Sequence, residues 1–136
     1  MMDLASQYLK RHRLSLSMYE DSCSELADDV RIWLSESGIK SQLLWIEPAP
    51  YGDAKECYVN LSLQTRHGKQ WWFHAVVLSG SLVHDAWLGQ PMRLPEYVEA
   101  MFPNQAVVVE FRSGHGCDKR LVFGPRRESH GASCSQ

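Results

Sequence analysis

Residues 71–88 read WWFHAVVLSGSLVHDAWL, and they contain two apolar runs separated by a short turn signal. The run at 70–78 predicts a buried strand, and the run at 82–86 predicts its antiparallel partner. Ser79 and Gly80 between them are typical of a hairpin turn. The stretch therefore predicts a β-hairpin with a histidine in an otherwise apolar strand.

The hairpin also predicts a partner for that histidine. Counting back from a two-residue turn at Ser79-Gly80 places His74 directly opposite Asp85, with Cβ atoms about 5 Å apart. Asp85 would then accept a hydrogen bond from the His74 ring and orient it. A turn longer by one residue would pair His74 with Ala86 and place Asp85 diagonally. In the alternative interpretation, His74 is a core histidine with one hydrogen bond and Asp85 merely ends its strand.

Residues 22–38 carry the clearest helix pattern. Ser22 followed by Glu25 fits a capping box, and Gly38 is a typical helix stop. Cys23 then lies in the first helical turn, where unpaired backbone N–H groups and the helix dipole favour a thiolate. The alternative is a cysteine buried in the core. Apolar residues recur with helical spacing and predict one buried stripe: Cys23, Leu26, Ala27, Val30, Trp33 and Leu34.

The rest of the chain predicts helices at 3–12 and 94–102 and strands at 42–46, 57–64, 106–111 and 120–123. Helices come first and strands follow, so we expect an α+β fold. In it, N-terminal helices pack on an antiparallel sheet of about five strands. We expect one domain over residues 1–125 and a flexible, polar C-terminal tail at 126–136.

Composition excludes several classes of protein. The 136 residues are 44% hydrophobic and 22% charged, as in an ordinary globular domain, and the net charge is -2. That charge gives no general attraction to nucleic acid. No apolar run approaches the roughly 20 residues that span a bilayer, so no membrane partner is expected. The N-terminal residues lack a secretory signal pattern, which predicts a cytoplasmic protein or one delivered to a target cell without a cleavable signal.

The cysteines do not form a metal or disulfide pattern. They are widely and irregularly spaced, without a C-x-x-C pair, at Cys23, Cys57, Cys117 and Cys134. We therefore expect free thiols, no metal and no cofactor. A weak His115–Cys117 site in a glycine-rich loop is the one alternative.

The order of three features resembles a known family. A cysteine starts a helix, a histidine lies in a later strand, and an aspartate lies on the next strand. This order is similar to the papain-like cysteine hydrolase superfamily in its compact bacterial forms. These forms include NlpC-type amidases, papain-fold toxin domains and glutamine-deamidating effectors. Residues 74–89 resemble the family's run of histidine, apolar strand, glycine turn, strand and aspartate, and residues 23–27 resemble the start of its nucleophile helix.

The resemblance implies a papain-like core with Cys23 as nucleophile, His74 as base and Asp85 as orienting group. No glutamine ahead of Cys23 matches the one that forms the family's oxyanion hole, so Asp21, Ser22 or backbone N–H groups are the candidates for that role. His84 should point to the opposite face from Asp85, as a surface or substrate-side residue. Four tryptophans are candidates for apolar pocket walls, with core packing as the alternative: Trp45, Trp71, Trp72 and Trp87.

These observations predict a cysteine-dependent amide hydrolase that forms a thioester intermediate. The reaction would be that of a peptidase, an amidase or a glutamine deamidase, and the substrate a protein or peptide. The alternative is a non-catalytic α+β module that binds a protein partner and buries an unreactive Cys23. The oligomeric state stays open.

Overall fold

The computed structural model describes residues 1–20, 22–49, 73–114 and 116–124. The expected strand at 57–64, the cysteines Cys57 and Cys134, and the tail at 126–136 lie outside these residues. The helical elements are α1 (Leu4–Arg11), the 3-10 helix η1 (Leu16–Tyr19), α2 (Cys23–Glu36) and α3 (Leu94–Met101). The strands are β1 (Gln42–Pro48), β2 (His74–Ser79), β3 (Leu82–His84), β4 (Met92–Arg93), β5 (Val107–Arg112) and β6 (Lys119–Phe123).

The strands form one curled, antiparallel sheet, which confirms the predicted α+β class. Its order is β4-β3-β2-β1-β5-β6, so the described residues contribute six strands where about five were expected. The two-residue strand β4 was not predicted, because two residues carry no readable alternation. The hairpin strands β2 and β3 lie between this short edge strand and the central strand β1.

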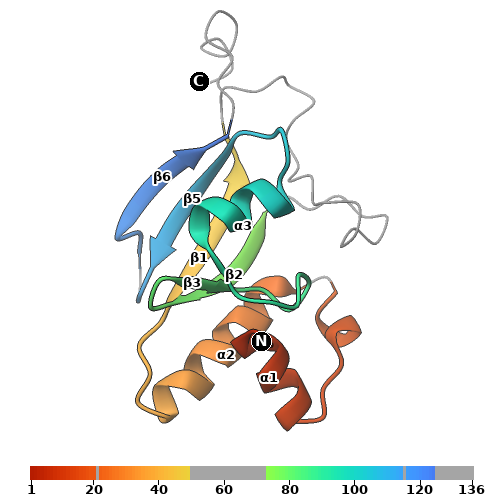
Figure 1. Ribbon diagram of the computed structural model, residues 1–136. Helices are drawn as coiled ribbons and strands as arrows, with labels where there is room; N and C mark the ends of the chain where they lie inside the picture. Colours follow the sequence, from red (N-terminus) through yellow and green to blue (C-terminus); the bar gives the residue numbers. More distant parts are fainter. Residues whose placement is uncertain (21, 50–72, 115, 125–136) are drawn as a thin grey trace, which may run out of the picture.

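Helices cover both faces of the sheet (Figure 1). Helices α1 and α2 lie on one face and share one group of buried apolar side chains, whereas α3 lies on the other face and packs on a second group. Strand β2 is buried on both sides: Val76 faces α3, whereas Ala75 and Val77 face α2. Side chains alternate along a strand, so His74 belongs to the α3 face with Val76.

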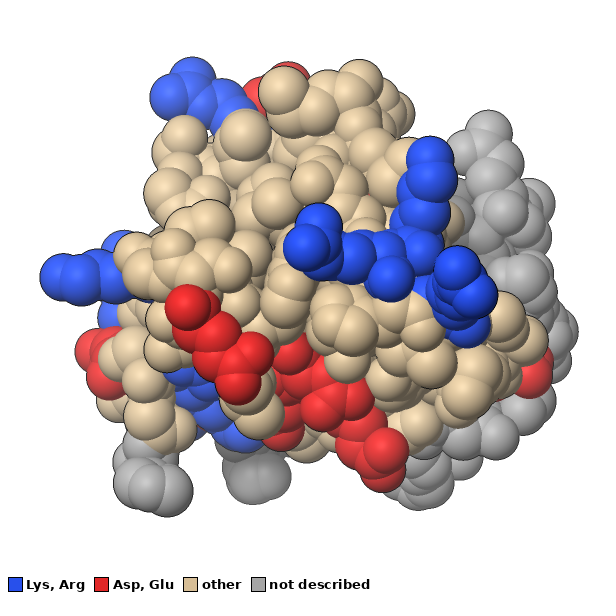
Figure 2. Space-filling view, turned by 90° about the horizontal axis from the view of Figure 1, so that it is seen from below, with Lys and Arg blue, Asp and Glu red and all other residues tan. Residues whose placement is uncertain are grey.

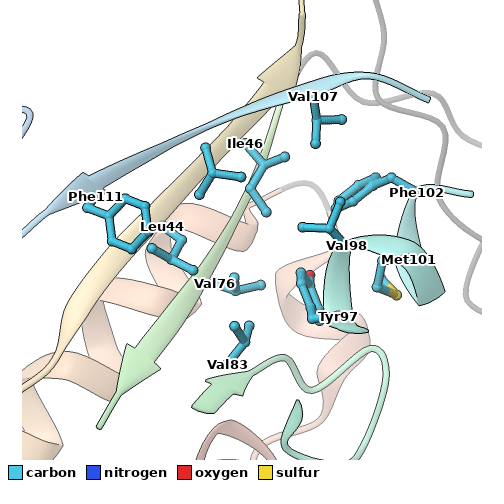
Figure 3. Close-up of a cluster of buried hydrophobic side chains, with 11 residues drawn as sticks. Leu44, Ile46, Val76, Val83, Tyr97, Val98, Met101, Phe102, Val107 and Phe111 are labelled. Carbon is cyan, nitrogen blue, oxygen red and sulfur yellow. The ribbon is translucent and has the colours of Figure 1, made fainter. Parts of the chain in front are cut away.

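The core on the α3 face contains the two largest fully buried side chains among the described residues, Tyr97 and Phe102. Tyr97 and Phe102 point from α3 and the residue after it toward the sheet (Figure 3). Their rings contact each other edge to face, with centroids 6.1 Å apart. The other buried members are aliphatic or sulfur-containing except for one phenylalanine: Leu44, Ile46, Val76, Val83, Val98, Met101, Val107, Val109 and Phe111. A polar group on this face is therefore shielded from water.

The core on the α2 face confirms the stripe predicted for the second helix. Its buried residues from α2 are Cys23, Leu26, Ala27, Val30 and Leu34, and Trp33 is half-buried. The helix ends as predicted, with Gly38 in the left-handed region at φ 77°. Helix α1 completes this core with Ala5 and Leu9.

The hairpin turn differs from the prediction. Ser79 pairs with Leu82, so the two turn residues are Gly80 and Ser81 and not Ser79 and Gly80. Gly80 has φ 63°, and a positive φ at the first turn position is typical of the mirror-image turns that match the twist of a hairpin. The glycine thus sets the turn one residue later, and every cross-strand partner shifts by two.

The helices are short, and the outer surface of α1 and α2 carries charged side chains. Within the described ranges, no helix is long and apolar enough to cross a membrane. Seen from below, where α1 and α2 lie in Figure 1, the surface carries acidic and basic side chains in separate groups (Figure 2). The last turn of α1 contributes Lys10 and Arg11 to the basic residues. The side of these helices that faces away from the sheet therefore carries charged side chains among uncharged ones, with Ile32 of α2 also exposed.

Candidate functional site

Asp85 is the centre of a buried hydrogen-bond array. It follows β3 directly and is only 2% exposed. Its Oδ2 atom lies 2.9 Å from Nε2 of His74 and accepts a hydrogen bond from the Tyr97 hydroxyl at 2.5 Å. Its Oδ1 atom accepts the backbone N–H of Trp87 at 2.9 Å. A buried carboxylate needs such donors, and three of them hold this one in a single orientation.

The predicted contact between His74 and Asp85 is present although the predicted register was wrong. Val77 pairs with His84, so an extension of this register would place Asp85 opposite Val76. Asp85 is therefore diagonal to His74. Because the register shift is two residues, it preserves the face on which each side chain lies. The two side chains stay on one face and still meet.

His74 is fully buried and closely surrounded. Its ring lies edge to face with Phe102 at a centroid distance of 6.1 Å. Burial alone lowers the pKa of His74, but the charge and hydrogen bond of Asp85, joined by those of Cys23, raise it to about 10. The imidazole therefore holds its proton at neutral pH. Of the two ring nitrogens, Nε2 is the one that contacts Asp85.

Cys23 is the first residue of α2 and lies close enough to His74 for its hydrogen bond and charge to act on the histidine. The thiol is free and only 8% exposed. It lines a cavity of about 10 Å³ with Ala5, Asp85 and Trp87. The sulfur of Cys23 therefore lies at the start of helix α2, near the His74 imidazole and next to this small cavity.

Among the residues predicted to lie beside the nucleophile, the structure describes Ser22 and Trp87. Ser22 occupies the N-cap of α2, but its side chain makes no capping hydrogen bond, so the predicted capping box is absent. Its backbone N–H donates to the Tyr19 carbonyl at 3.0 Å. Trp87 is half-buried and lines the cavity as expected of a pocket wall. Asp21, Trp71 and Trp72 lie outside the described residues.

His84 differs from its predicted position at the surface. It points away from the Asp85 side of the strand as expected, but it is only 6% exposed. Its Nδ1 atom accepts the backbone N–H of Leu4 at 3.0 Å, which joins β3 to the start of α1. Burial lowers the pKa of His84. The opposite face of β3 is covered by α1, which alternation along the strand does not reveal.

Tyr97 is a member of the array that the sequence analysis missed. It lies in the helix predicted over residues 94–102, in which no site residue was predicted. A tyrosine in a fully apolar stripe needs a partner for its hydroxyl, and a buried aspartate needs donors. Burial, with the charge of Asp85 and its hydrogen bond, raises the pKa of Tyr97 well above its ordinary value, so its hydroxyl stays a donor.

Other chemistry-bearing residues lie away from this array. Cys117 is exposed, and its thiol donates to the Lys119 carbonyl at 3.3 Å, while His115 lies outside the described residues. Across the described part of the chain, no three His, Cys, Asp or Glu side chains gather as a metal site would require. A wide hollow of about 690 Å³ is lined by Arg31 and Lys40 and contains none of the array residues.

The fold and this array define a small α+β protein with a helix-starting cysteine next to a buried histidine–aspartate–tyrosine array. Comparison with protein-family models, curated proteins and solved structures finds no match to the chain.

Proposed function

We propose that this protein is a cysteine-dependent amide hydrolase with Cys23 as nucleophile, His74 as acid and base, and Asp85 as orienting group. The observation that carries the proposal is the buried hydrogen bond between His74 and Asp85, with Cys23 acting on the same imidazole. Nucleophile, base and orienting group in this order are the minimum set for thiol catalysis. We further propose that the α+β domain has the papain-like core that the order of these residues resembles.

The first half of the proposed reaction forms a thioester. The raised pKa of His74 supports an imidazolium ion that holds the proton of the Cys23 thiol. The thiolate attacks the amide carbonyl carbon, and the carbonyl electron pair moves to oxygen. His74 then gives its proton to the leaving nitrogen, so that ammonia or an amine departs and an S-acyl group stays on Cys23.

The second half of the proposed reaction hydrolyses the thioester and regenerates the free enzyme. His74, now neutral, takes a proton from water, and the resulting hydroxide equivalent attacks the thioester carbonyl. The carbon–sulfur bond breaks, the carboxylic acid leaves, and the proton on His74 restores the starting pair. The backbone N–H groups of Cys23 and Ser24 at the start of α2 would hold the oxyanion in both halves, whereas that of Glu25 donates to the Ser22 carbonyl at 3.0 Å.

Tyr97 has a positioning role in this proposal. Its hydroxyl and the Trp87 N–H bind Asp85 from two directions, while the same carboxylate binds His74. The imidazole is thereby fixed with Nε2 toward Asp85 and Nδ1 available to Cys23. A fixed imidazole is what proton transfer requires, because small displacements cost large factors in rate.

The proposed substrate is a protein or peptide amide. Peptide cleavage, cell-wall amide cleavage and glutamine deamidation share the thioester chemistry and differ only in the group that leaves. We place the reaction in the cytoplasm or in a target cell to which the protein is delivered.

A non-catalytic interaction module is the second candidate. The observation in its favour is that Cys23 is only 8% exposed and borders a cavity of about 10 Å³. In that case the histidine–aspartate–tyrosine array would be a buried polar network that fixes one arrangement of the core.

The test is a product screen by mass spectrometry. Peptide pools containing glutamine are incubated with the protein, with Cys23→Ala and with Cys117→Ala, which removes an exposed thiol outside the array. We expect cleaved or deamidated products from the protein and from Cys117→Ala but not from Cys23→Ala. Equal product from Cys23→Ala would exclude the mechanism. His74→Gln should lose about 100-fold or more, as expected for a general acid–base group.

A further inference from the structure

The space around Cys23 is too small for a substrate. Its cavity of about 10 Å³ is close to the volume that one water needs, and the cysteine is 8% exposed. An amide carbonyl in line with the sulfur requires several times that volume. A thiol that reacts with a polypeptide must therefore be uncovered by a movement of part of the chain.

Helix α1 is the part that covers it. Ala5 lines the cavity together with Cys23, and Ala5 and Leu9 are 3% and 7% exposed in the core shared with α2. The other side of α1 is exposed at Gln7 and Lys10. In Figure 1, α1 lies beside α2, at the same end of the molecule. The segment can leave without breaking any strand.

Two contacts hold the start of α1 in place. The backbone N–H of Leu4 donates to Nδ1 of His84, a residue next to Asp85 in the chain. Asp3 is fully buried and caps the helix, accepting the Ser6 backbone N–H at 2.9 Å and its hydroxyl at 2.6 Å. Both contacts lie at the end of α1 nearest the nucleophile.

The helix has little stability of its own. It has 8 residues, and isolated helices shorter than about 12–15 residues are marginal in water. Its position therefore depends on Asp3, on the bond to His84 and on its packing against α2. That packing comes from buried Ala5 and Leu9 and from Tyr8, whose ring centroid lies 5.6 Å from that of Trp33. Elements held in this way belong to the part of a protein that opens locally without global unfolding.

We propose that residues 3–11 form an N-terminal strap that closes the Cys23 site and opens to admit substrate. The strap is autoinhibitory: in the closed state it fills the side of the cavity from which a carbonyl would reach the sulfur. Autoinhibition by the strap rests on the proposed hydrolase function, whereas the opening of the strap does not depend on that function. Binding of a substrate or partner that displaces α1 would activate the enzyme.

The test measures opening and not catalysis. Site-resolved mass spectrometry follows alkylation of Cys23 by iodoacetamide, with exposed Cys117 as an internal reference. Asp3→Ala removes the helix cap and should raise Cys23 alkylation by about fivefold or more at constant Cys117 alkylation. Lys10→Ala, on the exposed side of the same helix, should stay within about twofold of the unaltered protein.

A second pair of variants isolates the bond to His84. His84→Asn and His84→Leu have the same shape, but only asparagine keeps an acceptor near the position of Nδ1. We expect Cys23 alkylation to rise several-fold more in His84→Leu than in His84→Asn. Equal alkylation in the two variants would show that the bond does not hold the strap.

Hydrogen exchange in the unaltered protein covers the case in which variants fail to fold. The strap predicts that the amides of α1 and the Cys23 thiol open with the same free energy, below that of global unfolding. Alkylation of Cys23 only through global unfolding would overturn the proposal. If labelling rises in Asp3→Ala but no product forms, the strap stands and the hydrolase is excluded. If Cys23-dependent product forms while labelling is unchanged, the strap is excluded and the hydrolase stands.

Discussion

The two faces of the sheet hold their parts of the candidate site in different ways. On the α3 face, His74, Asp85 and Tyr97 are each 2% exposed or less and are joined through one carboxylate. On the α2 face, Cys23 is covered by a helix of 8 residues that is capped by Asp3, bonded to His84 and packed on the α2 core through Ala5 and Leu9. The base is rigidly fixed, whereas access to the nucleophile depends on a marginal element. Orientation of the base and access to the thiol are thus controlled separately.

The largest expected effect is on the α3 face. Asp85→Ala leaves His74 buried without its charged partner, which should lower the free energy of unfolding by about 3–5 kcal/mol. Chemical denaturation measures it, and the exposed Asp28→Ala on α2 is the matched control with an expected change within about 0.5 kcal/mol. A loss in Asp85→Ala no larger than in the control would mean that the array does not stabilise the core.

Tyr97→Phe should have the next largest effect. The ring stays in place while Asp85 loses one donor, so we expect a loss of about 1–3 kcal/mol in unfolding free energy. Tyr19→Phe removes the hydroxyl that donates to Asp29 at 3.0 Å in a partly exposed position, and it should cost less. A larger loss of unfolding free energy in Tyr19→Phe than in Tyr97→Phe would contradict the claim that the hydrogen bonds to Asp85 hold the α3 face rigidly.

The pH dependence of stability should have two limbs of opposite origin. The pKa of His74 is raised from 6.5 to about 10, so its contribution is complete below pH 6.5 and is lost as pH rises toward 10. The pKa of His84 is lowered from 6.5, so the native state resists protonation and loses stability as pH falls below 6.5. Denaturation midpoints across pH should flatten on the alkaline side in His74→Gln and on the acidic side in His84→Asn. Unchanged limbs in these variants would assign the pH dependence to other groups.

The smallest expected difference in unfolding free energy is between variants at the N-terminal caps of α1 and α2. Ser22 makes no capping hydrogen bond, so Ser22→Ala should change the unfolding free energy by less than about 0.5 kcal/mol. Asp3 caps α1, so Asp3→Ala should cost about 1 kcal/mol. Thermal or chemical unfolding of both variants measures the difference, and equal losses would contradict it.

The sequence predicts what depends on local pattern. The stripe from Cys23 to Leu34 and the order of helices and strands follow from periodicity, and both are present. The pairing of His74 with Asp85 was also predicted, although through a register that was wrong by two residues. It survives because such a shift keeps both side chains on one face.

What the sequence does not predict depends on contacts between distant segments. Leu4 and His84 are 80 positions apart, and nothing in either segment indicates that α1 covers that side of β3. Tyr97 reaches Asp85 from a helix that is predicted over 94–102 but in which nothing marks a site residue. The sequence Ser79-Gly80-Ser81 allows Gly80 to be either the first or the second residue of the two-residue turn. The positive φ of Gly80 at the first position is seen only in the structure.

The most direct test of the central claim is whether His74 activates Cys23. In the Asp3→Ala background, which opens the strap, alkylation of Cys23 is measured at about pH 6.5, where ordinary thiols are almost fully protonated. We predict that Cys23 reacts faster than exposed Cys117 in the same molecules and that His74→Gln removes this advantage. A Cys23 that reacts no faster than Cys117, or equally fast with and without His74, would contradict the proposed nucleophile.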